Sequence, residues 1–189
     1  GGYLFFIAAV LLVSFLARRQ SQAAVLNQQR ARQLAQLEEL GRAFIQLSAD
    51  MEQLPAILRE YLPRMFDYDE AEIRFVDETV LLRLPAGSAS RDPRLWAWLY
   101  ETRQPAAFVK GDTLPWSDQS SNENLVMAPI RHTESNASMG GICLRSRGRI
   151  TTIGIRESLP SLQVLAAQIA SLLHRREAYE KRLALERVT

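Results

Sequence analysis

The segment NLVMAPIRHTESNASMGGICLRSRG, residues 124–148, has the pattern of two strands joined by a polar turn. Apolar side chains dominate both halves, and Glu134, Ser135 and Asn136 between them are turn formers. We therefore predict a β-hairpin with strands over 125–131 and 139–145. The pair Gly140-Gly141 opens the second strand, where we expect the backbone to pack closely against a neighbour.

Shorter strands are predicted upstream of this hairpin. Residues 71–76 and 80–84 alternate between polar and apolar side chains, and Asp77-Glu78 between them favours a tight connection. Another short strand is expected over 106–109. These segments predict three more strands beside the hairpin.

Helical patterns lie before and between the strands. Residues 51–65 carry apolar side chains at helical spacing, and Asp92-Pro93 is typical of the start of a helix that runs to about Arg103. Helices before, between and after strands indicate an α+β fold with an antiparallel sheet flanked by helices.

Two long helices are predicted at the ends of this domain. Residues 18–48 contain no proline and one glycine, and a second helix is expected to start at Pro160 and to continue through the charged C-terminal residues. Both show the 3-4 spacing of a coiled coil, and we expect them to pair in a parallel homodimer. For the first helix, above all over residues 37–47, the alternative is that it packs on its own domain. The predicted dimer positions are Leu37, Leu40, Phe44, Leu165, Ile169, Leu172 and Tyr179.

The first seventeen residues contain no charge and stop at Arg18-Arg19. Fifteen helical residues, 3–17, cover roughly 22 Å of a bilayer core that is about 30 Å thick. We therefore expect a membrane helix that begins upstream of Gly1. A signal peptide would carry its basic residues before the apolar run instead of after it.

Charge predicts the orientation of this helix. Four arginines and no acidic residue lie between Arg18 and Leu37, and positive flanks stay on the cytoplasmic side. The soluble part is therefore expected in the cytoplasm, at the inner membrane. A single cysteine, Cys143, excludes a disulfide framework. The remaining arginines are scattered, which argues against nucleic-acid binding.

The order of these elements resembles a known family. The hairpin quoted above, followed by LPSLQVLAAQIASLLHRREAYE (residues 159–180) and preceded by WLYETRQPAAFV (residues 98–109), resembles a GAF domain. The resemblance implies a GAF-like sheet in a sensory domain. The predicted organisation is a membrane helix at 1–17, a juxtamembrane linker helix at 18–36, a GAF-like domain at 37–175 and an outgoing signalling helix at 176–189.

A narrower resemblance concerns AWLYETRQPAAFVKGDTLPWS, residues 97–117. It is similar to the GAF region of the osmosensitive potassium-channel sensor histidine kinases, which share a Trp-containing helix, Gln-Pro-Ala and Asp-Thr-Leu-Pro in this order. This chain differs in its polar insertion at 117–124 and lacks the glycine usual after Pro-Ala. We expect that insertion to be an exposed loop.

A small-molecule pocket, where present, is expected between the sheet and residues 92–118. The alternative is that its aromatic side chains simply fill the core. The ligand cannot be named from the sequence, and no cofactor is identified. The candidate pocket residues are Trp96, Tyr100, Phe108, Trp116 and Met127.

Catalytic and metal-binding patterns are weak in this sequence. His132 and His174 lie far apart, so we expect no metal site. A Cys143–His132 nucleophile pair is the open alternative to a buried, inert cysteine. The acidic residues Asp67, Asp69, Glu70 and Glu72 are interpreted as a solvated turn without basic partners.

These observations predict a non-catalytic sensory module of a membrane-bound bacterial signalling protein. A two-component sensor histidine kinase, with kinase domains beyond residue 189, is the preferred output. The alternatives are a diguanylate cyclase or other nucleotide-handling output on the same module, and a membrane-anchored docking scaffold without a ligand.

Overall fold

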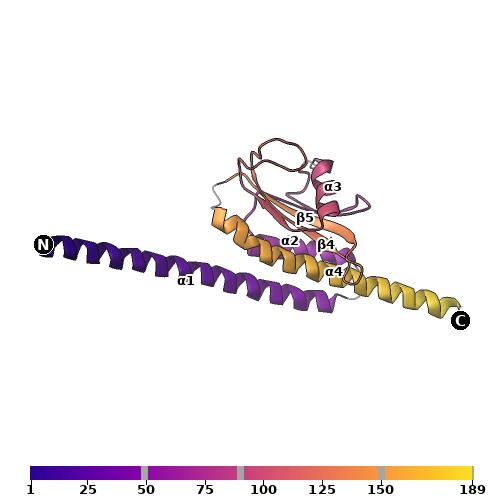
Figure 1. The fold of residues 1–189 in the computed structure, drawn as a ribbon. Helices are drawn as coiled ribbons and strands as arrows, with labels where there is room; N and C mark the ends of the chain where they lie inside the picture. The colour runs from indigo at the N-terminus through magenta and orange to yellow at the C-terminus, as the bar shows by residue number, and fades with distance from the viewer. Residues whose placement is uncertain (48–50, 89–91, 149–151, 189) are drawn as a thin grey trace.

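The computed structural model describes residues 1–47, 51–88, 92–148 and 152–188. A five-stranded antiparallel sheet with the order β2-β1-β5-β4-β3 forms its centre (Figure 1). The α+β class and the predicted strands are confirmed. The strands are β1 Glu70–Phe75, β2 Val80–Leu84, β3 Ala106–Phe108, β4 Asn124–Arg131 and β5 Ser138–Ser146.

The β4–β5 hairpin occupies the middle of the sheet. Met127 lies opposite Cys143 and Ala128 opposite Ile142, and all four side chains are buried. A strand buried on both faces needs a nearly continuous apolar run, which explains the composition of β4. The predicted close packing at the glycine pair is confirmed: a Cβ on Gly140 would lie 2.3 Å from the carbonyl oxygen of Arg74.

Helices form separate layers on the two faces of the sheet. Helices α2 (Leu54–Met65) and α4 (Thr152–Val188) pack on one face, and α1 (Gly2–Gln46) lies outside them (Figure 1). A single turn of 3₁₀ helix, Met51–Gln53, precedes α2, so the predicted helix over 51–65 is confirmed with a tighter first turn.

Helix α3, Pro93–Thr102, covers the opposite face of the sheet. The carboxylate of Asp92 accepts a hydrogen bond from the backbone N–H of Arg94 at 2.9 Å, which caps the helix as predicted. Hydrogen bonds from the Arg94 guanidinium, together with this backbone bond, lower the pKa of the Asp92 carboxyl group below its ordinary value. Arg103 ends the helix in the left-handed conformation.

The predicted start of the last helix at Pro160 is wrong. Helix α4 already begins at Thr152, and Pro160 is an exposed residue within it. The buried side chain of Ile155, which is 1% exposed, belongs to the core between the sheet and its helices. Burial of Ile155 favours a helix that starts upstream of Pro160, although the proline has no N–H to donate to the helix.

Helices α1 and α4 run side by side in the same direction. Ser161 donates to the side-chain oxygen of Gln33 at 2.9 Å, and the Gln168 amide donates to the carbonyl oxygen of Leu37 at 3.1 Å. The contacts advance along both helices together, so the pair is parallel.

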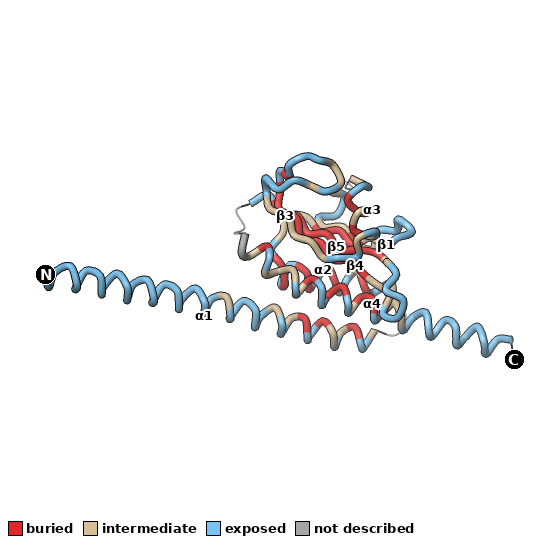
Figure 2. The backbone as a smooth tube through the Cα atoms, viewed as in Figure 1, coloured by how far each residue is buried: buried red, intermediate tan, exposed pale blue. Residues whose placement is uncertain are grey.

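Six of the seven predicted dimer positions lie in the core of a single chain (Figure 2). These side chains are at most 5% exposed, so the first helix packs on its own domain, as in the alternative, and the last helix does the same. Only Tyr179 is exposed, at 50%. A second copy has to use other faces of these helices. The six buried positions are Leu37, Leu40, Phe44, Leu165, Ile169 and Leu172.

The two long helices extend beyond the domain at opposite ends (Figure 2). The first part of α1 is exposed and apolar, with an 18-residue window of mean hydropathy 1.7, so by length and composition it is a candidate membrane span. Residues 175–188 of α4 are also exposed. The predicted membrane helix and linker helix therefore form one uninterrupted helix.

Candidate ligand-binding site

The five predicted pocket residues come together on the α3 face of the sheet. Trp96 and Tyr100 come from α3, Phe108 from β3, and Met127 from β4. Trp96 and Met127 are at most 2% exposed, whereas the others are half-buried. The five residues chosen from the sequence therefore belong to one cluster in the structure.

Aromatic rings in this cluster pack directly against one another. The ring centroids of Phe108 and Trp116 lie 5.4 Å apart, and those of Trp98 and Trp116 lie 5.5 Å apart. These are ordinary packing distances for aromatic pairs, so no ring-sized space separates these side chains. Trp98 was not among the predicted residues, although its position two residues after Trp96 could have indicated it.

Tyr100 connects the cluster to neighbouring strands. Its hydroxyl donates to the carbonyl oxygen of Phe75 at 3.3 Å, and its own carbonyl oxygen accepts from the Ser138 hydroxyl at 2.6 Å. Burial raises the pKa of the Tyr100 hydroxyl to about 12. The Tyr100 hydroxyl is therefore protonated at physiological pH and can donate this hydrogen bond.

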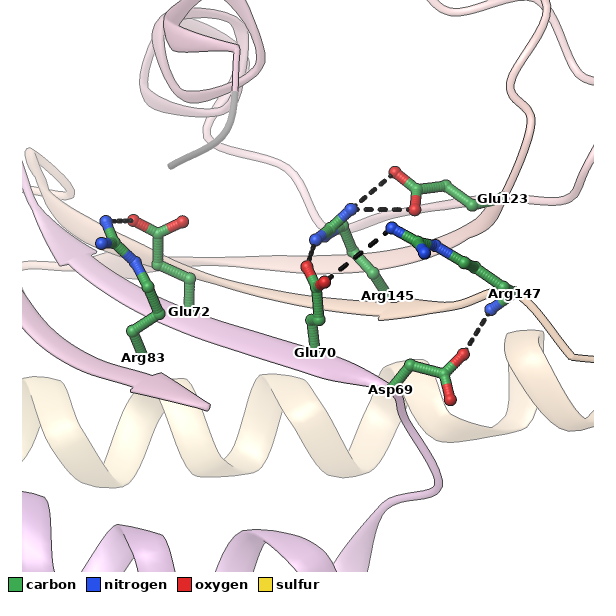
Figure 3. A network of polar contacts seen from close by, with 7 residues as sticks. All are labelled: Asp69, Glu70, Glu72, Arg83, Glu123, Arg145 and Arg147. Carbon is green, nitrogen blue, oxygen red and sulfur yellow. Dashed lines mark hydrogen bonds and ion pairs between the residues drawn. The ribbon is translucent and has the colours of Figure 1, made fainter. Parts of the chain in front are cut away.

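A row of charged side chains lies along strands β1, β2 and β5 (Figure 3). Arg145, whose side chain is 4% exposed, contacts both carboxylate oxygens of Glu123, at 2.9 and 3.0 Å. It also pairs with Glu70, its register partner on β1. A buried arginine held between two carboxylates is fully committed to the fold.

The second half of the row is centred on Glu72, which is 5% exposed. One carboxylate oxygen accepts from Arg74 at 3.2 Å and from Arg83 at 3.1 Å. The Arg74 guanidinium carbon lies 5.4 Å from the centre of the Trp96 ring, which links the row to the aromatic cluster.

This row corrects the interpretation of the acidic residues as a solvated turn without basic partners. Glu70 and Glu72 are paired with arginines, and Asp69 accepts from the backbone N–H of Arg147 at 2.6 Å. It also corrects the polar segment at 117–124, because Glu123 and Asn124 at its end are buried. The period-two spacing Glu70, Glu72, Arg74 was the available signal, since alternate residues share one face.

Glutamates and arginines in the row balance one another. Glu70, Glu72 and Glu123 face Arg74, Arg83 and Arg145, so the row is neutral as a whole. Among the described residues, the buried Nε of Arg83 has no hydrogen-bond acceptor. A ligand on this face would have to replace one partner of these ion pairs or displace an aromatic ring.

A cavity of about 620 Å³ opens between α1, the end of α2, the start of α4 and the strands β4 and β5, and Arg145 of the charged row also lines it. Arg30, Arg32 and Arg64 line it together with Glu157. The helices around this cavity cover the face of the sheet opposite α3, so none of the predicted pocket residues lines it. Arg30 and Glu157 form an ion pair at 3.1 Å across its wall.

The two histidines meet in space, which the sequence separation did not suggest. Their ring centroids are 5.2 Å apart, His132 in the β4–β5 turn and His174 on α4. Cys143 does not join them. It lies opposite Met127, five residues and about 16 Å along the strand from His132, so the Cys–His nucleophile pair is excluded.

Comparisons with known proteins identify the fold. The sequence matches no protein-family model and no curated protein. A solved GAF domain of a protein assigned as a sensor histidine kinase from Pseudomonas syringae pv. tomato is similar, at 21% identity and a TM-score of 0.57, over 89% of this chain and 98% of that one.

Other solved GAF structures are similar over nearly their full length. A GAF domain from A. aeolicus in an inactive state gives a TM-score of 0.58 at 11% identity, over 78% of this chain and 99% of that one. A free methionine-R-sulfoxide reductase from Neisseria meningitidis gives 0.54 at 11% identity, over 76% and 89%. The chain therefore has the GAF fold, which hosts both sensory domains and an enzyme.

Proposed function

We propose that this chain is the non-catalytic sensory module of a membrane-bound bacterial signalling protein. The observation that carries the proposal is the parallel pair α1–α4, in which one helix enters and the other leaves the same core. A displacement of α1 therefore acts directly on α4 through shared side-chain packing.

Fold and composition support this role over catalysis. Cys143, the only cysteine, is 1% exposed inside the sheet, where a thiol acts as a small apolar group. The charged row is internally neutralised, and its carboxylates are engaged by arginines. These features suit a domain that transmits a change in packing.

A ligand on the α3 face has to open the aromatic cluster. Trp96, Tyr100, Phe108, Trp116 and Met127 remain its proposed contacts, because they belong to one cluster that Trp96 links to the charged row. Binding there would move α3 relative to the sheet. Mass spectrometry of small molecules released from the purified protein is the direct way to identify such a ligand.

The proposed location is the inner membrane, with the GAF domain in the cytoplasm. The exposed apolar start of α1 supports the membrane span, and the arginines that follow it support the orientation. A histidine kinase beyond residue 189 is the proposed output, supported by the similar domain from Pseudomonas syringae. A phospho-accepting His motif after residue 189 would agree with it, whereas Gly-Gly-Asp-Glu-Phe would indicate a diguanylate cyclase.

Cysteine labelling in cells tests the proposed topology. In a Cys143→Ala background, Arg182→Cys marks the exposed end of α4. We expect a membrane-impermeant maleimide to label Arg182→Cys in spheroplasts only after permeabilisation. Labelling of Arg182→Cys in intact spheroplasts, or recovery of the protein in the soluble fraction, would refute the proposal.

A further inference from the structure

We propose that His132, His174 and Glu177 bind a divalent transition-metal ion, Zn²⁺ in the first instance, and that Glu134 supports the site. Ligand atoms of the first three residues all lie within 4.8 Å of one another. The site joins the β4–β5 turn to α4 at the point where α4 leaves the domain. The ion would act as a clamp on the outgoing helix.

Two elements contribute two side chains each. His174 and Glu177 lie three residues apart on α4 and therefore share one helix face. His132 and Glu134 lie in the turn, which is closed by a hydrogen bond of 2.8 Å from the His132 N–H to the Ala137 carbonyl oxygen. The ligands are thus carried by ordered backbone.

The distances leave space for an ion. His132 Nε2 lies 3.8 Å from the Glu177 carboxylate, which is too long for a hydrogen bond. A tetrahedral zinc ion with bonds of about 2.0–2.1 Å needs its ligand atoms about 3.4 Å apart, so a small inward rotation of the side chains suffices.

An unsatisfied nitrogen also points to a ligand. His174 Nδ1 is buried and has no hydrogen-bond partner in the described part of the chain. Buried polar atoms are normally paired, and a metal ion would use a ring nitrogen of this histidine. Glu134 is suited to accept the remaining ring N–H, as carboxylates commonly do beside metal-bound histidines.

The two imidazoles select the type of ion. Imidazole nitrogen with a carboxylate suits Zn²⁺ and its neighbours in the transition series, whereas Mg²⁺ and Ca²⁺ prefer oxygen ligands alone. His132 Nδ1 now accepts from the N–H groups of Glu134 and Ser135 at 3.3 Å. Binding through Nε2 would shift its proton to Nδ1 and break these two long bonds, a cost that limits the affinity, and we expect micromolar binding.

Isothermal titration with ZnCl₂ tests the site in the full chain, purified in detergent without a histidine tag and treated with EDTA. We expect one Zn²⁺ per chain, loss of binding in His132→Gln and His174→Gln, and a decrease of about 10- to 100-fold in affinity in Glu134→Gln. Glu180→Gln, which removes the Arg176 partner one turn further along α4, is the matched control and should bind normally.

Two further measurements separate the site from adventitious binding. Co²⁺ should give the visible absorption of a tetrahedral site in the wild type and not in His174→Gln. Unchanged circular dichroism of the apo-variants would show that they fold. No saturable binding below 1 mM, or binding that both histidine variants retain, would overturn the site.

The clamp on α4 rests on the proposed function, whereas metal binding does not. We expect Zn²⁺ to slow tryptic cleavage at Arg175, Arg176, Lys181 and Arg182 about tenfold in the wild type and not in His174→Gln. Stoichiometric binding without protection would remove the clamp and keep the site. A topology opposite to the proposed one would refute the proposed function and with it the role of the clamp in signalling, whereas the measured binding and protection would stand.

Discussion

Gly140 is the residue at which β5 approaches β1 most closely. Its register partner is Phe75, and a Cβ added here would lie 2.3 Å from the Arg74 carbonyl oxygen and 3.1 Å from the Phe75 Cα. Both are backbone atoms in the middle of a sheet. They cannot move aside without separating the strands.

Gly140→Ala should therefore destabilise the protein by about 2–3 kcal/mol, the usual range for overpacking against rigid surroundings. Urea unfolding followed by tryptophan fluorescence measures the change. Gly148→Ala is the matched control, because nothing lies within 4 Å of its added Cβ. Equal stability of the two variants would contradict the close approach.

Residue patterns predicted the apolar part of this site better than its charged part. Trp96 and Met127 were recognisable because apolar side chains at strand or helix spacing imply burial. The pairing of Glu72 with Arg83, or of Arg145 with Glu123, depends on which strands are neighbours. That register follows from the whole sheet and is not written in any local segment.

At the scale of elements, α4 shows how packing overrides a local signal. Pro160 is typical of a helix start, yet α4 continues through it because Ile155 upstream is buried. The strands, α2 and α3 were all predictable, since their periodicity and caps agree with their tertiary contacts. Among these elements, the boundary that was predicted wrongly is the start of α4, because it depends on the tertiary contacts of Ile155.

Pro160→Ala should stabilise the protein by about 1–2 kcal/mol. The substitution restores a backbone N–H that can donate to the carbonyl oxygen of Arg156 and removes the ring clash of an interior proline. Pro160 is exposed, so little packing is lost. A thermal melt of the full chain in detergent measures the effect, and an unchanged or lower melting temperature would contradict it.

At the scale of the whole molecule, the outer faces of α1 and α4 remain available for a second copy. Leu34 is 63% exposed, Ile45 71% and Val164 44%, and Tyr179 and Leu183 continue an apolar stripe along the free end of α4. The homodimer is still a prediction, and we now expect its interface at these exposed side chains instead of the six buried positions.

Leu34→Asp combined with Val164→Asp should convert a dimer into a monomer, because charge on an apolar interface is costly to bury. Analytical ultracentrifugation of the full chain in detergent measures this. Val76→Asp, an apolar residue with 45% exposure on the β1–β2 turn, is the control and should leave the dimer intact. A dimer that survives the double substitution would place the interface elsewhere.

The parallel arrangement of α1 and α4 also has a mechanical consequence. The free ends of the two helices lie at opposite ends of the molecule, and their contacts are distributed along the shared length (Figure 1). A pull between these ends loads all the contacts in shear, so that they must break together instead of unzipping one by one. The pair is therefore stiff toward tension along its axis, and a force on the N-terminal helix is transmitted to the C-terminal helix with little displacement between them.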